Sequence, residues 1–144
     1  MTYEEFLDKN GEMTYSNVGT SMMPLLKQGR DLFTVRKKGN KRCKKYDVVL
    51  YRRPPDKYVL HRIIKVRRDD YVILGDNCVS KEYGITDDDI IGVMTAYVHN
   101  GKKHTTAFWG YRLYSFIWVS FSFLRIFLKK TKMKAARFVR IFGR

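Results

Sequence analysis

The 144-residue sequence contains few cysteines and prolines, and it has no acidic side chain after Asp89. Its two cysteines, Cys43 and Cys78, are too few for a disulfide framework and lack metal-ligand spacing, so we expect idle free thiols. No cofactor or metal site is expected. The first residues are acidic and contain no apolar run, which excludes a secretory signal there.

The positive charge is concentrated in the C-terminal third of the chain. Lys and Arg number 29 against 14 acidic residues, a formal net charge of +15. Residues 1–89 hold all 14 acidic and 18 basic residues, or +4, whereas residues 90–144 hold 11 basic residues and are +11. With 44% hydrophobic and 15% aromatic residues the chain has enough apolar side chains for a core, which excludes a wholly disordered basic tail.

The first two thirds of the sequence predict a mainly β fold. Thr2 and Glu5 match a capping box and predict a short N-terminal helix. Asn100-Gly101 predicts a hairpin between Thr95–His99 and Lys102–Thr106. Short runs rich in Val, Ile, Tyr and Thr, separated by turn residues, predict strands over Met13–Val18, Leu32–Lys37, Tyr46–Tyr51, Tyr58–Val66, Tyr71–Leu74 and Ile90–Val98. We therefore expect a compact antiparallel β domain over residues 1–107.

Residues 108–144 predict a basic, aromatic-rich helical extension. The uncharged stretch between Arg112 and Arg125 is shorter than the roughly 20 residues that a span needs, but Trp109–Leu128 would cross a bilayer if both arginines extended to its surfaces. An interfacial helix on anionic lipid is one alternative, and a helix packed on its own β domain is another. A spanning helix would place the β domain outside and the basic tail in the cytoplasm, whereas an interfacial helix on the inner leaflet would leave the β domain cytoplasmic.

Three short segments contain the side chains of an acyl-transfer site. Ser21 lies in a turn bounded by Gly19 and Pro24, where its hydroxyl and its backbone N–H can face one carbonyl. His61 belongs to a predicted strand, and Asp76 and Glu82 belong to the polar segment after the next strand. Each residue alone is ordinary in a turn or a core. Together they offer a nucleophile, a base and a carboxylate.

These segments resemble type I signal peptidases, in the superfamily that also contains the LexA-like self-cleaving repressors. The resemblance covers residues 15–94 and lies in Thr20-Ser21-Met22-Met23-Pro24, His61-Arg62, Gly75-Asp76-Asn77 and a closing strand at 90–94. Bacterial members carry Lys before the Arg, whereas His in that place is similar to the endoplasmic-reticulum and archaeal branch. In that branch the acid follows the Asp of Gly-Asp-Asn by six residues, which is Glu82 here. Because Glu replaces Asp, either Glu82 or Asp76 is the expected third group.

The resemblance implies a signal-peptidase/LexA-like fold and a serine endopeptidase that cleaves leader or signal peptides through an acyl-enzyme. Ser21 would be the nucleophile and His61 the general base, and the backbone N–H of Ser21 would hold the oxyanion. Residues expected to assist oxyanion or substrate binding are Thr20, Met22, Pro24 and Asn77. The expected partners are a peptide or preprotein and membrane lipid bound by residues 108–144, with no specific nucleic acid.

Two other functions are compatible with parts of the sequence. The alternative from a different class is a non-catalytic module that uses the same fold to bind anionic lipid at a membrane surface. A self-cleaving regulator is not expected, because the 20 residues before Ser21 leave no room for a DNA-binding domain.

Overall fold

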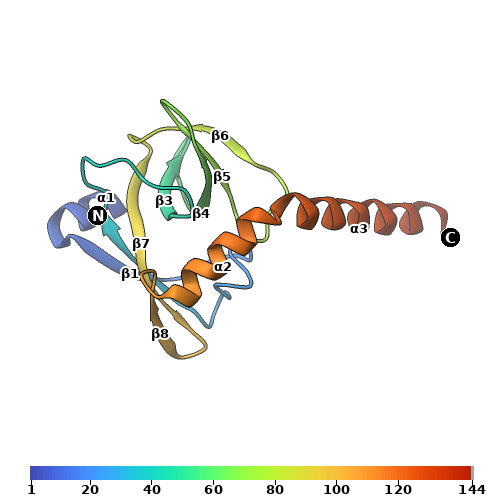
Figure 1. Ribbon diagram of the computed structural model, residues 1–144, viewed down its shortest axis with the longest axis horizontal. Coiled ribbons are helices and arrows are strands. Elements are labelled where there is room, and N and C mark those ends of the chain that lie inside the picture. The colour runs from blue at the N-terminus through green and yellow to red at the C-terminus, as the bar shows by residue number, and fades with distance from the viewer. Residues whose placement is uncertain (144) are drawn as a thin grey trace.

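The computed structural model describes residues 1–143, and over that range it contains one antiparallel sheet, a short N-terminal helix and two C-terminal helices (Figure 1). The sheet order is β1-β2-β7-β3-β4-β5-β6, with β8 paired to β7, and all of these pairs are antiparallel. The strands are β1 (Glu12–Ser16), β2 (Leu32–Lys37), β3 (Val48–Arg53), β4 (Lys57–Val66), β5 (Tyr71–Leu74), β6 (Glu82–Ile85), β7 (Ile90–His99) and β8 (Lys102–Thr105). The mainly β, antiparallel fold class is confirmed.

Local sequence signals account for both ends of the β domain. Helix α1 (Tyr3–Asn10) begins at the predicted capping box, in which Thr2 and Glu5 each bond the other's backbone N–H. The final hairpin also forms as predicted, with Asn100 and Gly101 in the left-handed conformation at its turn. Strand β6 was not predicted, because it is short and pairs only with β5 among the described strands.

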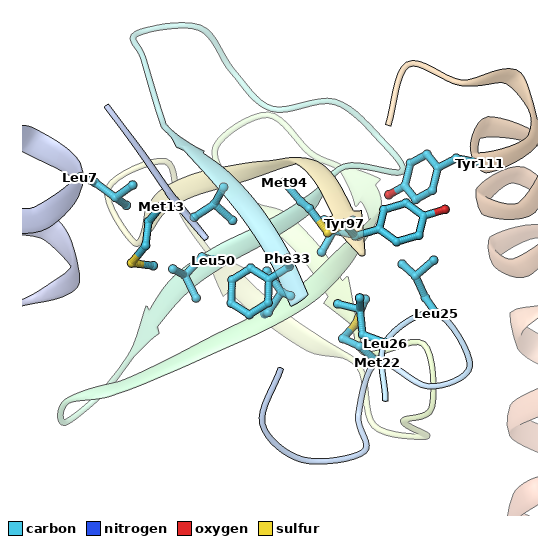
Figure 2. Packing of buried hydrophobic residues seen from close by; sticks show 13 residues of the cluster. Leu7, Met13, Met22, Leu25, Leu26, Phe33, Leu50, Met94, Tyr97 and Tyr111 are labelled. Atoms are coloured by element: carbon cyan, nitrogen blue, oxygen red, sulfur yellow. The ribbon is translucent and has the colours of Figure 1, made fainter. Parts of the chain in front are cut away.

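The sheet bends enough to bury both faces of its central strands. Register shifts interrupt the pairing of β2 with β7, β3 with β7, and β4 with β5, and such irregularities increase twist and curvature. Alternate residues of β3 therefore enter two different hydrophobic clusters: Val48 and Leu50 join one, and Val49 and Tyr51 join the other. The first cluster also takes up residues 22–26, and Figure 2 shows Met22 and Leu26 near Phe33.

The C-terminal extension is two helices, α2 (Trp109–Ser120) and α3 (Ser122–Phe142), separated at Phe121, where helical geometry is lost. The uninterrupted helix over Trp109–Leu128 that a bilayer span would require is therefore not formed. None of the helices within residues 1–143 combines the length and apolar character needed to cross a membrane. The spanning alternative is corrected on this point.

The two helices differ in how they relate to the β domain. Helix α2 runs along the domain and buries Tyr111 and Ser115 against it, as the packed-helix alternative predicts. Helix α3 continues outward, so that its C-terminal part extends away from the β domain (Figure 1). From Lys130 to Gly143 every residue is exposed.

Candidate active site

The turn that presents Ser21 is held from below by the core and by a buried asparagine. The amide of Asn17 donates to the carbonyl oxygens of Gly19 at 3.3 Å and Leu26 at 3.2 Å. Met22 is fully buried in the core cluster, so the next residue in sequence anchors the turn while the side chain of Ser21 stays half-buried. Met22 therefore has no exposed surface for a substrate, and the substrate-binding role expected of it is replaced by this structural one.

The Gly75-Asp76-Asn77 loop closes directly on the Ser21 turn. The backbone N–H of Asn77 donates to the carbonyl of Ser21 at 2.8 Å, and its side-chain amide donates to the carbonyl of Thr20 at 3.1 Å. Asn77 thus holds the nucleophile turn, and its amide N–H is already engaged. Thr20 contributes its backbone to this link.

His61 lies against the same loop on its other side. A Cβ atom added to Gly75 would be 2.9 Å from Nε2 of His61 and 2.9 Å from the carbonyl oxygen of Ser21. Real Cβ atoms do not approach other atoms so closely, so a residue without a side chain is required at position 75. Ser21 and the Nε2 edge of His61 therefore approach Gly75 together, although no hydrogen bond joins their side chains in the described structure.

The other edge of the His61 ring faces two groups from neighbouring strands. Its Nδ1 lies 3.3 Å from the hydroxyl of Tyr51 and 3.8 Å from Oε1 of Glu82. With the proton on Nδ1, Nε2 is free to accept a proton on the Ser21 side. Arg53 donates two hydrogen bonds to Glu82 and holds its carboxylate in this position.

The environment of His61 keeps its imidazole neutral. The side chain is 8% exposed, and burial lowers its pKa to about 4, against a raising effect of Glu82 and a further lowering by Arg53. A neutral imidazole at pH 7 is the form that a general base requires.

The two candidate carboxylates have different partners. Asp76 is 2% exposed, and its two oxygens accept hydrogen bonds from Nε and Nη2 of Arg62 at 2.8 and 2.9 Å. The hydroxyl of Tyr114 in α2 also donates to it at 2.9 Å. Of the two, only Glu82 is printed within ion-pair distance of His61. The geometry therefore favours Glu82 as the group that orients His61, and it gives Asp76 a structural partner.

Ser21, His61, Asn77 and Glu82 line one cleft of about 740 Å³. Its walls come from residues 17–19, from the start of β4, and from Lys129 and Met133 of α3. No acceptor within residues 1–143 bonds the backbone N–H of Ser21, which is the donor expected to hold an oxyanion. Pro24 lies outside this cleft, next to Leu25 on a different pocket, so the structure does not bring it to the site.

Sequence reasoning missed three residues that complete this arrangement. Tyr51 and Arg53 reach His61 and Glu82 because β3 pairs with β4 in a register that sets Val49 opposite His61. Strand alternation then predicts that side chains at 51 and 53 share the face of Val49, but the pairing itself is not readable from the sequence. Lys129 comes from α3 and donates to both oxygens of Asn77, and no motif announces that contact.

The thiols and metal-ligating residues suggest no further chemistry. Both cysteines are free, and burial raises the pKa of Cys43 to about 11 and raises that of Cys78 as well. Neither thiol is therefore a thiolate near neutral pH. No group of three His, Cys, Asp or Glu side chains within residues 1–143 is arranged to hold a metal ion.

No protein-family model, curated protein or solved structure matches the chain. Its function is therefore inferred from the residues and geometry of this cleft.

Proposed function

We propose that this chain is a serine endopeptidase of the signal-peptidase type, and that its β domain has the signal-peptidase/LexA-like fold. The observation that carries the proposal is the position of His61. One ring nitrogen faces the loop that bonds the Ser21 turn, and the other faces Glu82 and Tyr51, all within one open cleft. This is the order of contacts that a nucleophile, base and orienting acid require.

In the proposed reaction Ser21 Oγ attacks the scissile carbonyl and His61 Nε2 takes the hydroxyl proton. The charge that develops on the carbonyl oxygen is stabilised by the backbone N–H of Ser21. His61 then gives the proton to the leaving amine, and an acyl-enzyme forms on Ser21. Water, deprotonated by His61, releases the acyl group. Glu82 stabilises the transient imidazolium, and Arg53 acts as a positioning residue for Glu82.

The peptide would lie extended between residues 17–19 and the beginning of β4, which form two walls of the cleft. Beside the cleft is an apolar pocket of about 90 Å³ whose lining includes Met13, Phe33, Leu50 and Leu60. A pocket of this size favours a small aliphatic side chain near the scissile bond. Alanine is the expected preference in the resembling enzymes, and we propose the same class of leader or signal peptide here.

Labelling with a serine-directed acylating probe tests the nucleophile. We expect the wild-type chain to be labelled on Ser21, with the site located by mass spectrometry. Ser21→Ala should lower labelling at least about a hundredfold, because the attacking oxygen is removed while the fold is kept. The matched control is Ser80→Ala, since Ser80 is an exposed serine in the same cleft.

Two outcomes would contradict the catalytic assignment: equal labelling of the Ser21→Ala chain, or no labelling of a wild-type chain shown to be folded by circular dichroism. The second result would favour the non-catalytic lipid-binding alternative. Loss of labelling in Ser21→Ala but not in Ser80→Ala would support the peptidase.

The low pKa of His61 predicts the acid limb of the pH profile. Because burial lowers the pKa of His61 to about 4, kcat/KM should stay within about 10% of its plateau at pH 5.5 and fall only near pH 4. A free histidine, with a pKa of about 6.5, would leave only about a tenth of the base active at pH 5.5. Arg53 lowers the pKa of His61, so Arg53→Gln should shift the limb to higher pH. An acid limb near pH 6.5 in the wild type would contradict this environment.

A further inference from the structure

Large apolar side chains are exposed mainly on the C-terminal helices. Of 21 exposed large hydrophobic residues, 15 lie between residues 108 and 142. Four phenylalanines of α3 have more than 60% of their surface exposed: Phe123, Phe127, Phe138 and Phe142. A helix turns about 100° per residue, so these four share one face of α3. Contiguous exposed apolar surface of this kind marks an interaction site.

The rest of α3 is strongly basic. Between Ser122 and Phe142 there are seven Lys and Arg side chains and no acidic one. None of the ion pairs within residues 1–143 involves a residue of α3. Lys132 and Arg137 lie to either side of the phenylalanine face, where cations would meet headgroups if the phenylalanines entered a bilayer. The helix therefore carries both parts of an interfacial membrane anchor.

We propose that α3 binds the surface of an anionic lipid bilayer, lying in the interface with its phenylalanine face inserted and its basic side chains on the headgroups. A nucleic acid would pair with the charge but leave the phenylalanines in water. A second copy of the helix would cover the phenylalanines but would bring two sets of seven positive charges together. Anionic lipid satisfies both features.

This orientation has a consequence for the cleft, and that consequence rests on the proposed peptidase function. Lys129 and Met133 line the cleft and lie on the side of α3 opposite to Phe127 and Phe138. With the phenylalanine face down, the cleft lies on the water side of a helix about 10 Å thick. Lys129 also donates to Asn77, which joins the anchor to the loop that holds the Ser21 turn. Peptides attached to the same bilayer would therefore be favoured substrates.

Co-sedimentation with vesicles tests the anchor. The full chain should bind vesicles made of equal parts phosphatidylcholine and phosphatidylglycerol and should bind pure phosphatidylcholine vesicles at least about tenfold more weakly. Lys132→Glu/Arg137→Glu should weaken binding to the anionic vesicles at least about a hundredfold. Phe127→Ser/Phe138→Ser should weaken it at least about tenfold. The matched control is Lys102→Glu/Lys103→Glu, which makes the same charge change on exposed residues of β8 and should bind like wild type.

Equal loss in the β8 control would show binding by overall charge and overturn the proposal. So would unchanged binding in the phenylalanine variant, or a stable dimer in sedimentation that buries the phenylalanines and abolishes vesicle binding. Ser21→Ala should bind vesicles normally, so that failure of the anchor and failure of the peptidase are distinguishable. In a cleavage assay, an acyl-anchored peptide on vesicles should be cut at least about tenfold faster than the same peptide free, and Lys132→Glu/Arg137→Glu should remove that advantage.

Discussion

Replacing His61 with alanine should lower kcat/KM for peptide cleavage by about 10⁴-fold or more. Without the imidazole, the Ser21 hydroxyl keeps its proton and is a weak nucleophile at neutral pH. Because Ser21 and His61 act as a unit, the double variant Ser21→Ala/His61→Ala should be no slower than either single variant. Steady-state kinetics on a peptide substrate checks both statements.

His104→Ala is the matched control for His61→Ala. His104 lies on β8, where its ring stacks on Tyr97, and it does not line the cleft. Its replacement should leave kcat/KM within about threefold of wild type. Similar losses in the two variants would mean that His61 acts through stability rather than chemistry. Multiplying losses in the Ser21 and His61 double variant would contradict a shared step.

Breaking the buried ion pair under the active-site loop should give the largest loss of stability. Arg62 is fully buried, and besides Asp76 it donates to the Ser115 hydroxyl at 2.7 Å and to Tyr111 at 3.2 Å. Burial acts to lower the pKa of Arg62, but Asp76 outweighs it and the pKa is raised. Asp76→Asn leaves this guanidinium buried without its counter-charge. We expect a loss of about 3–5 kcal/mol in the free energy of unfolding, measured by urea denaturation.

Glu82→Gln is the comparison that separates the two carboxylates. Glu82 is half-buried and pairs with Arg53 near the cleft rim, so its replacement should cost less than about 1 kcal/mol of stability. It should lower kcat/KM by about tenfold or more, because the imidazolium loses its counter-charge. A Glu82→Gln chain with full activity, paired with an Asp76→Asn chain that is stable and inactive, would reverse the roles argued for these two groups.

Several parts of the fold follow from local chemistry and could be read directly from the sequence. The capping box of Thr2 and Glu5 begins α1, and Asn100-Gly101 forms the hairpin turn because both residues accept positive φ. The strands with strong β-branched and aromatic content formed within a few residues of the predicted ranges. Strand β6 was missed because its pairing, not its composition, defines it.

The sequence by itself determined which chemical groups are present, their order along the chain, and the separation of charge between the β domain and the C-terminal helices. These depend only on residue identity and spacing. Tertiary structure decided which groups meet. The β3–β4 register brought Tyr51 and Arg53 to His61 and Glu82, and the docking of α2 gave Asp76 and Arg62 their buried partners. Such contacts join residues up to 53 positions apart, and long-range pairing is set by the packing of the whole core, which no local pattern records.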